Sequence, residues 1–358
     1  MEKGTVLVTG GAGFLGQHVV ELLQSSAEHV TDIRIFDMEP YINKLGYQER
    51  KPVKSIIGSV LDTGALQEAC KGVDAVFHLT GCVDTRMFPD VQKLNAVNVQ
   101  GTENVIQACK KGNVKRLIYC STVDVVIGRD GHVFNGTETT TSIPQKSCFF
   151  FGPYAETKQK AEELVLKANG SDIANGGKLR TLSLRPTVMY GELDKYFVTE
   201  IVRTACTSKF FRPINSGSSV LQCTYVRNAA WCFLCAERTL RGDNSIAGQS
   251  FFVCDDTPLT NMFEFSKPYL RVHGIDVNKK PLPFWPVVYL FYFLWCILWV
   301  IFPVFQFNIS IGICSILSLG TTMTFSSNKA QTLLLYKPIY SHKQAQNMSL
   351  KFYRTLKF

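Results

Sequence analysis

A tyrosine and a lysine four positions apart, Tyr154 and Lys158, form the pair in this chain best suited to moving a proton. At this spacing both side chains lie on one face of a helix. A phenol with a pKa of about 10 is a weak base at neutral pH, but a neighbouring ammonium stabilises the phenolate and lowers that pKa. Ser121 and Thr122 supply two hydroxyls at the end of an apolar stretch. Because Tyr-x-x-x-Lys is common by chance, its meaning depends on the elements that position it.

Three glycines with the spacing Gly10-x-x-Gly13-x-x-Gly16 follow a short apolar strand and open a helix. Gly10 permits a tight turn, Gly13 has no Cβ to obstruct a pyrophosphate, and Gly16 lets the helix pack close to the sheet. The backbone around Phe14 and Leu15 then offers N–H groups and the positive end of the helix dipole to an anion. This strand–turn–helix context predicts a dinucleotide site rather than a purely structural turn.

An acidic residue, Asp37, ends the second predicted strand, residues 33–37. It follows the glycine turn by about 20 residues, the distance at which a dinucleotide fold places its ribose-binding acid. A carboxylate accepts hydrogen bonds from a ribose and repels a 2′-phosphate. Asp37 therefore favours NAD over NADP, and a solvated or helix-capping aspartate is the alternative.

Other strand ends supply the remaining predicted cofactor contacts. Ser59 and Val60 follow a third strand, residues 53–57, and are expected to cover the adenine. A fourth strand ends at Thr80 and Gly81, where a missing side chain lets the backbone approach the cofactor.

An amphipathic helix over residues 95–110 directs Asn98 toward the same site. His78 lies within an apolar strand, so a buried structural histidine is the expected role. The fifth strand carries Ser121 and Thr122 to its carboxyl end, which is the edge where open α/β sheets bind ligands.

Strands that alternate with helices predict an α/β fold with a Rossmann-type, doubly wound parallel sheet and a smaller C-terminal substrate lobe. We expect an NAD-binding domain with the Tyr/Lys pair over residues 1–191 and a substrate-binding lobe over 192–280. A membrane-embedded hydrophobic segment over 281–320 and a basic tail over 321–358 follow. The polar stretch 128–145 is expected to be a surface loop.

Together these motifs resemble the extended short-chain dehydrogenases/reductases and, within them, the 3β-hydroxysteroid dehydrogenase/Δ5–Δ4 isomerase family. The resemblance covers nearly the whole chain, and its late motifs separate it from sugar-nucleotide epimerases. It rests on residues 9–16, 98–102, Tyr154 with Lys158, 184–187, 190–191, 254–258, 329–331 and 336–338.

The resemblance implies that Tyr154 is the general base for a sterol 3β-hydroxyl and that Lys158 binds the nicotinamide ribose. Thr122 stands where the family places a serine that donates to the substrate oxygen, and Ser121 could replace it. A hydride would pass from C3 of a Δ5 sterol to NAD, followed by a double-bond shift. Two further residues, Pro186 and Thr187, should line the nicotinamide.

Besides Thr122, three positions depart from the family pattern. Ser59 replaces an aspartate, which predicts weaker but not absent NAD binding. Phe252 stands at the position of the isomerase tyrosine, although Asp256 matches the isomerase aspartate. Because a phenyl ring cannot donate a proton, the isomerase step is in doubt. Arg227 replaces a glycine, and the sequence offers no reason for it.

The cysteine content indicates the redox compartment in which this chemistry takes place. The 12 cysteines are scattered through apolar stretches, and the first strand begins too early for a secretory signal, so we expect free thiols in a reducing compartment. Cys232 and Cys235 have CxxC spacing, but no second pair or nearby histidine completes a metal site. No metal site is predicted.

The formal net charge of +9 is unevenly placed, since Val277 to Phe358 contains no Asp or Glu. These cations flank an apolar segment, which indicates a membrane face and not a nucleic-acid partner. Residues 283–305 carry no polar side chain other than aromatic ones. Their uninterrupted core, 287–302, is slightly shorter than the ~20 residues of a spanning helix. A hydrophobic lid over a steroid pocket is the alternative.

We therefore expect a sterol dehydrogenase on the endoplasmic reticulum membrane, with its catalytic domain in the cytosol and with lipid as a partner. A mitochondrial membrane and a homodimer are left open. One alternative is a C4-carboxysterol 3-dehydrogenase, which would use the same catalytic set. The other is a catalytically silent, NAD-binding membrane scaffold, against which the intact Tyr154 and Lys158 argue.

Overall fold

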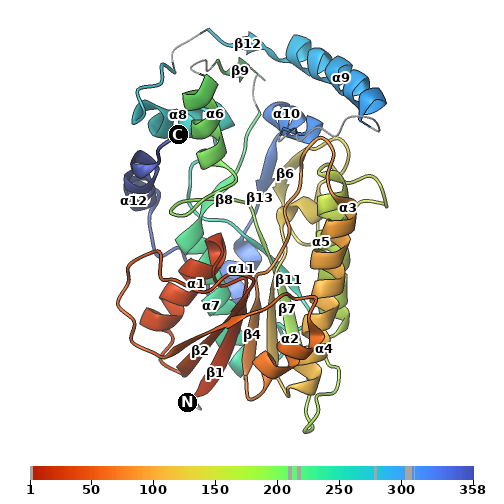
Figure 1. Ribbon diagram of the computed structural model, residues 1–358, viewed down its shortest axis with the longest axis vertical. Helices are drawn as coiled ribbons and strands as arrows, with labels where there is room; N and C mark the ends of the chain where they lie inside the picture. The colour runs from red at the N-terminus through yellow and green to blue at the C-terminus, as the bar shows by residue number, and fades with distance from the viewer. Residues whose placement is uncertain (1–2, 209–211, 216–218, 278–279, 303–308, 310) are drawn as a thin grey trace.

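A central parallel sheet occupies the lower half of the molecule, and smaller elements form the upper half (Figure 1). The structure is a computed structural model of the chain. It describes residues 3–208, 212–215, 219–277, 280–302, 309 and 311–358.

Seven strands form the sheet in the order β11-β7-β5-β4-β1-β2-β3, and every neighbouring pair is parallel. This order, with the first strand near the middle, is that of a doubly wound Rossmann sheet. Its strands are β1 Gly4–Thr9, β2 Val30–Asp37, β3 Val53–Ile57, β4 Ala75–His78, β5 Arg116–Cys120, β7 Arg180–Pro186 and β11 Ser250–Val253.

Helices cover both faces of the sheet, and the strand side chains alternate between them. Val6 and Val8 join the apolar cluster under α1 (Phe14–Ser26) and α7 (Val226–Gly242), whereas Leu7 joins the opposite cluster. The inner strands β1 and β4 are largely buried on both faces, which explains their nearly continuous apolar runs, whereas the edge strand β3 has no buried residue. The opposite face is covered by α2 Thr63–Cys70, α4 Gly101–Lys111 and α5 Gly152–Lys167.

Among the described residues, the upper half contains three two-stranded parallel sheets and several helices (Figure 1). The paired strands are β6 Val133–Gly136 with β13 Met323–Phe325, β8 Val188–Tyr190 with β10 Cys223–Tyr225, and β9 Ile214–Asn215 with β12 Leu282–Pro283. The remaining helices are α3 Val91–Leu94, α6 Val198–Ser208, α8 Met262–Arg271, α9 Phe284–Ile301, α10 Ile313–Leu317, α11 Asn328–Leu333 and α12 His342–Thr355.

The predicted sheet is confirmed, but the expected surface loop over residues 128–145 is wrong in part. It contains β6, whose Val133 pairs with Met323, almost two hundred positions later. Such pairing leaves no local signal. Some of residues 192–280 lie in the lower half of the molecule, because α7 and β11 belong to the layers of the central sheet. The predicted separation of the chain into a nucleotide domain and a substrate lobe stays a prediction.

Arg227, which the sequence left unexplained, joins three separate segments. Its Nη1 lies 3.0 Å from Glu21 Oε1 of α1, and its Nη2 lies 3.7 Å from Glu192 Oε1. Its guanidinium also faces the Tyr340 ring at 6.0 Å. These side chains are largely buried, so the cation compensates two carboxylates that would otherwise lack an opposite charge.

We expect Arg227→Met to lower the free energy of unfolding by about 3 kcal/mol, because removing one partner of a buried pair leaves its carboxylates uncompensated. Urea unfolding would measure the change. Lys167→Met is the matched control: it breaks the exposed pair with Glu163 and should change stability by less than about 1 kcal/mol. Equal effects in the two variants would contradict a structural role for Arg227.

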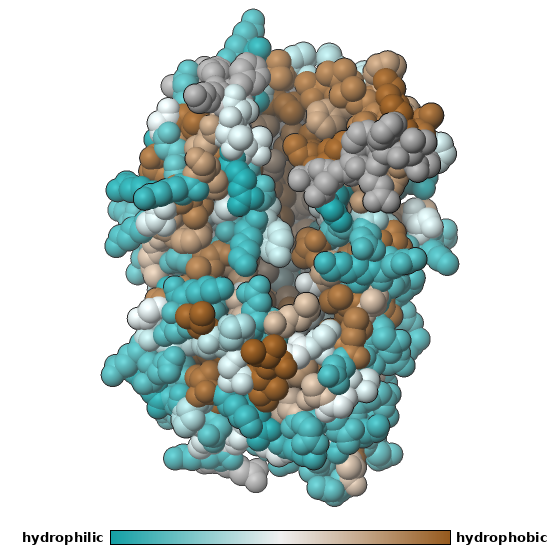
Figure 2. Space-filling model, viewed as in Figure 1, coloured by the Kyte–Doolittle hydropathy of each residue, from teal (hydrophilic) through white to brown (hydrophobic). Residues whose placement is uncertain are grey.

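The helix α9 presents an apolar surface to solvent. It is the one helix in the described ranges that is long and apolar enough to cross a membrane, with a mean hydropathy of 2.1, and only 6% of its residues are buried. In Figure 2 the upper right of the molecule is correspondingly hydrophobic. Residues 303–305, which the predicted apolar segment includes, lie outside the described residues.

Candidate active site

Most predicted site residues gather at the carboxyl edge of the sheet. The reason is topological, since parallel strands all end at the same edge. Figure 2 shows the surface hollowed along the middle of the molecule, above this edge. The strand ends that meet there are Thr9 before Gly10, His78 before Thr80 and Gly81, Cys120 before Ser121 and Thr122, and Pro186 before Thr187.

The glycine turn has the geometry that its spacing predicts. Gly10 has a φ of +72°, and a Cβ there would lie 2.8 Å from Thr80 N. A Cβ on Gly16 would lie 2.2 Å from Gly10 O, so only glycine allows α1 this close. A Cβ on Gly13 would approach only Gly10 O, at 3.1 Å. The open side of Gly13 leaves room for a ligand.

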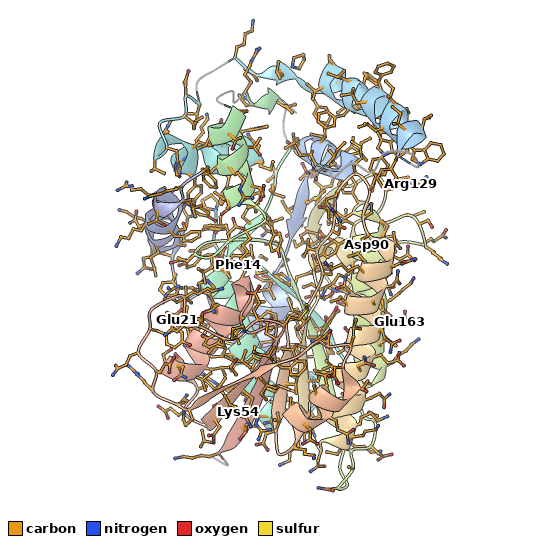
Figure 3. The ribbon with its side chains drawn as sticks, viewed as in Figure 1. Phe14, Glu21, Lys54, Asp90, Arg129 and Glu163 are labelled. Carbon is orange, nitrogen blue, oxygen red and sulfur yellow. The ribbon has the colours of Figure 1, made fainter. Side chains whose placement is uncertain are left out.

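The N-terminus of α1 is available to an anion. Helix α1 begins at Phe14, and no side chain caps it. Figure 3 places Phe14 at the end of α1 that faces the middle of the molecule. Leu15 is buried beneath the turn. Uncapped N–H groups and the helix dipole favour a phosphate here.

Asp37 lies beside the glycine turn. Its Oδ2 accepts a hydrogen bond from Ala12 N at 3.0 Å, which holds the carboxylate at the end of β2. Ser59 Oγ accepts from Leu61 N at 3.2 Å, so its hydroxyl stabilises a local turn. Val60 is buried against Gly101, and Asn104 donates to its carbonyl. The adenine contacts of Ser59 and Val60 stay a prediction.

Helix α5 brings Tyr154 and Lys158 to the same edge. Lys158 Nζ donates to Cys120 O at 2.6 Å and lies 4.4 Å from the centre of the Tyr119 ring. A Cβ on Gly81 would lie 3.6 Å from Lys158 Nζ. The absence of a side chain at Gly81 therefore leaves a gap beside the ammonium.

Burial dominates the ionisation of this pair. It raises the pKa of Tyr154 well above its ordinary value, and the negative charge of Asp124 raises it further. A hydrogen-bond interaction with Thr122 lowers it. Burial also lowers the pKa of Lys158. Without a further cation the phenol is neutral at pH 7.

Asn98 lies next to the pair, and both polar atoms of its side chain form hydrogen bonds within the protein. Its Oδ1 accepts from Cys82 N at 2.7 Å, and its Nδ2 donates to Cys82 O at 3.0 Å and to Thr157 Oγ1 at 3.1 Å. The expected regular helix is interrupted here by a π-helix, Asn95–Gln100, a distortion common at functional sites. Asn98 thus joins the exit of β4 to α5, and its cofactor contact stays a prediction.

Two hydroxyls follow β5, as predicted. The buried Ser121 Oγ has no hydrogen-bond partner among the described residues. Thr122 Oγ1 donates to Asp124 Oδ2 at 2.9 Å and accepts from Asp124 N at 3.2 Å. Sequence reasoning missed Asp124. The signal was present, because a Thr followed two residues later by an acid is typical of a short capped turn.

The predicted nicotinamide wall is buried. Pro186 ends β7 beside Val253, and Thr187 N donates to Val253 O at 3.1 Å. The Thr187 hydroxyl lies 2.5 Å from the Thr224 hydroxyl. Their contact with a nicotinamide stays a prediction.

His78 is a structural histidine, as expected. Its ring nitrogens lie 2.7 Å from Thr9 Oγ1 and 3.0 Å from Thr102 Oγ1. Burial, with the nearby charge of Lys158, lowers its pKa to about 3, so it is neutral at physiological pH.

The predicted isomerase positions do not meet. Phe252 is completely buried, packs on Phe325 with ring centres 4.9 Å apart, and belongs to an apolar cluster. Asp256 is exposed. The neighbouring Asp255 accepts from Tyr225 N and Asn228 Nδ2, which is a structural role.

The cysteines are all free thiols, as expected. Cys232 and Cys235 are buried within α7. These two cysteines therefore pack in the hydrophobic core.

The described residues also enclose a cavity of about 400 Å³ at the opposite, amino edge of the sheet. Its lining is basic, and three of its cations form ion pairs within the protein: Arg116 with Glu237, Lys115 with Asp74 and Lys178 with Asp172. It lies away from Tyr154 and the glycine turn.

Comparison with known proteins agrees with this arrangement. A profile described as the 3-beta hydroxysteroid dehydrogenase/isomerase family matches residues 7–284. Mouse (Mus musculus) 3 beta-hydroxysteroid dehydrogenase type 7 is 31% identical over 362 residues, which cover 98% of this chain and 95% of the mouse protein.

Solved structures share the fold. MoeE5 in complex with UDP-glucose and NAD has a TM-score of 0.70 at 19% identity, covering 98% of this chain and 99% of that one. UDP-glucuronic acid 4-epimerase from Bacillus cereus in complex with NAD has a TM-score of 0.69 at 19% identity, covering 98% of both chains.

Proposed function

Because the chain belongs to the 3-beta hydroxysteroid dehydrogenase/isomerase family, an extended short-chain oxidoreductase family, we propose that it oxidises the 3β-hydroxyl of a Δ5 sterol to the ketone with NAD. The observation that carries this proposal is the convergence of the glycine turn, Asp37 and the Tyr154/Lys158 pair at one edge of the sheet.

The residues present fit NAD. The uncapped start of α1 would hold the pyrophosphate, and the open side of Gly13 gives it room. Asp37 would bind the adenosine ribose and repel a 2′-phosphate. Lys158, beside the gap at Gly81, would bind the nicotinamide ribose. The bound cofactor supplies a hydride acceptor and a positive charge next to Tyr154.

The protein's own residues move the proton of the alcohol. Tyr154 would take that proton from the sterol hydroxyl, with Thr122 or Ser121 contacting the same oxygen. The positive charges of Lys158 and of the oxidised nicotinamide oppose the effect of burial and lower the pKa of the phenol. Positioning at the end of a rigid sheet keeps these groups in reacting distance.

We do not expect this protein to isomerise its product efficiently. The buried phenyl ring of Phe252 offers no proton donor, and Asp256 is exposed. A double-bond shift would then be spontaneous or would use other groups.

The test is NADH formation at 340 nm by detergent-solubilised protein with a 3β-hydroxy-Δ5 sterol, with enone absorbance at 240 nm followed in parallel. NADH without a matching enone signal is the expected result. NADH only from a C4-carboxysterol would favour the decarboxylating enzyme. NAD binding without turnover of either substrate would favour a silent scaffold.

We also propose that α9 embeds in a membrane, that of the endoplasmic reticulum, with the catalytic half in the cytosol. At about 27 Å, α9 is close to the ~30 Å hydrocarbon core of a bilayer. Both flanks of α9 fold onto the same body, since β12 pairs with β9 and β13 pairs with β6. This favours a helix that dips into one face over a single crossing.

We expect the double variant Leu290→Lys/Phe293→Lys to move from the membrane pellet to the soluble fraction. Both side chains are exposed, and each added lysine costs about 3 kcal/mol at the centre of a membrane helix. Flotation of expressed protein with vesicles measures the change. The matched control is Leu335→Lys, which charges a still more exposed leucine away from α9. A double variant that still floats would contradict membrane embedding through α9.

A further inference from the structure

One face of α5 carries three ionisable side chains at intervals of four residues: Tyr154, Lys158 and Glu162. This spacing places them in a row along the helix, and all three are buried. Tyr154 and Lys158 lie at the carboxyl edge of the sheet, whereas Glu162 lies one turn further along α5. The proposed reaction uses only the first two.

The Glu162 carboxylate is bound by β7 through both of its oxygens. Arg185 Nε lies 3.1 Å from Oε1 and 3.0 Å from Oε2, and Arg185 Nη2 donates to Oε1 at 2.5 Å. Ser183 Oγ donates to Oε2 at 2.8 Å. Only 8% of the Arg185 side chain and 4% of the Glu162 side chain are exposed. A buried bidentate pair with a further hydrogen bond is held in one geometry.

This pair is one of two side-chain contacts that set α5 along β7. Thr181 lies four positions before Arg185, so both side chains leave the same face of the strand. Thr181 Oγ1 donates to Val165 O at 2.7 Å, and Arg185 binds Glu162, about one turn nearer the start of α5. Strand and helix therefore run in opposite directions, and the next turn of α5, which carries Lys158, lies toward the end of β7.

A contact of Lys158 fixes the other end of the same helical turn. Lys158 Nζ donates to Cys120 O at 2.6 Å, and Cys120 pairs with Leu184, the residue before Arg185. On the other side of β7, Phe252 pairs with Arg185, and the centre of its ring lies 5.5 Å from Arg185 Cζ. Hydrogen bonds to neighbouring strand ends thus determine where this turn of α5 lies.

We propose that Glu162 is a positioning residue for hydride transfer. Through Arg185 it fixes the distance between the Tyr154/Lys158 pair and the nicotinamide, which the end of β7 would support. The proposal rests on the proposed dehydrogenase function, and Glu162 acts through α5 without contacting the sterol. Because the reacting atoms must lie about 3–3.5 Å apart, a displacement of about 1 Å is enough to slow the reaction by about 10²-fold.

The first experiment measures hydride transfer to NAD in a single turnover, as the appearance of NADH at 340 nm. Glu162→Gln replaces one acceptor oxygen with an NH₂ group, which cannot accept from Arg185 and breaks one arm of the bidentate pair. We expect the rate to fall about tenfold or more, with the dissociation constant of NAD changed by less than about twofold. Arg185→Lys keeps the charge but lacks the planar fork, so it should slow the same step.

Glu237→Gln is the matched control for Glu162→Gln. Glu237 is also buried and accepts from Arg116 Nε at 3.0 Å, but Arg116 lines the cavity at the opposite, amino edge of the sheet. Both substitutions disrupt a buried ion pair, so both should lower the melting temperature, whereas only Glu162→Gln should slow hydride transfer. Equal rates in the two variants overturn the proposal. If Glu162→Gln does not fold, Arg185→Lys is compared with Arg116→Lys instead.

The second experiment needs no sterol, so it separates failure of the positioning role from failure of the proposed function. The reduced nicotinamide is fluorescent, and its emission depends on the groups that surround the ring. We expect bound NADH to change its emission intensity in Glu162→Gln and to keep it in Glu237→Gln. A wild type that oxidises no sterol refutes the dehydrogenase proposal alone, and NADH emission then decides the positioning role. Wild-type emission in Glu162→Gln overturns that role.

Discussion

Tyr154→Phe should lower kcat/KM for sterol oxidation by about 10²- to 10⁴-fold, the range of a positioned general acid–base group. The substitution removes one oxygen from a ring that is only 9% exposed, so the packing of α5 is retained. The phenyl ring cannot accept the alcohol proton. NADH formation at 340 nm measures the loss, and NAD binding should persist because the glycine turn and Asp37 are unchanged.

The matched control is Tyr289→Phe, which removes the same atom from an exposed ring of α9. This variant should retain the activity of wild type. If Tyr154→Phe kept more than about a tenth of the wild-type activity, an effect far below that of a general base, another group would take the proton. Loss of NAD binding in Tyr154→Phe would instead indicate a folding defect.

Gly16→Ala should abolish measurable NAD binding and destabilise the fold. The new Cβ would lie 2.2 Å from Gly10 O and 2.6 Å from Gly11 Cα. Both are backbone atoms, so a change of side-chain rotamer cannot relieve the clash. Helix α1 must therefore move away from the glycine turn that would hold the pyrophosphate. Overpacking of this kind costs about 1–3 kcal/mol or more. Fluorescence quenching by NAD and thermal unfolding would measure the two effects.

Gly64→Ala provides the control with the opposite sign. Gly64 lies in the first turn of α2, and the nearest atom to an added Cβ is Asp62 Oδ1 at 3.5 Å. Alanine is the better helix former by about 0.5–1 kcal/mol, so the melting temperature should rise slightly while NAD binding is unchanged. A Gly16→Ala protein that binds NAD like wild type would disprove the role of the close approach.

The sequence was sufficient for the sheet and its ligand edge because the signals there are local. The apolar strands, the glycine turn and Asp37 each occupy a few consecutive residues, and parallel strands must end together. Tyr154 and Lys158 needed only helical spacing. The free cysteines and the structural role of His78 followed from apolar surroundings.

What the sequence did not predict depends on contacts between distant segments. The β6–β13 pairing joins residues almost two hundred positions apart. Arg227 is explained only by Glu21 and Glu192, which come from other elements. The π-helix at Asn98 depends on bonds to Cys82 and Thr157. Asp124 was within reach of a local argument, because it follows Thr122 by two residues and accepts a hydrogen bond from its hydroxyl.

The last helix, α12, has a consequence for how the chain is made. The buried Tyr353 hydroxyl accepts from Gly191 N and donates to Asp194 Oδ2, and Asp194 in turn holds the backbone at the start of α6. The ribosome makes α12 after α9, so α9 emerges before the hydrogen bonds of Tyr353 can form. Early insertion of α9 into lipid would shield it during that delay, whereas synthesis without a membrane would leave an incompletely folded chain exposed to aggregation and proteolysis.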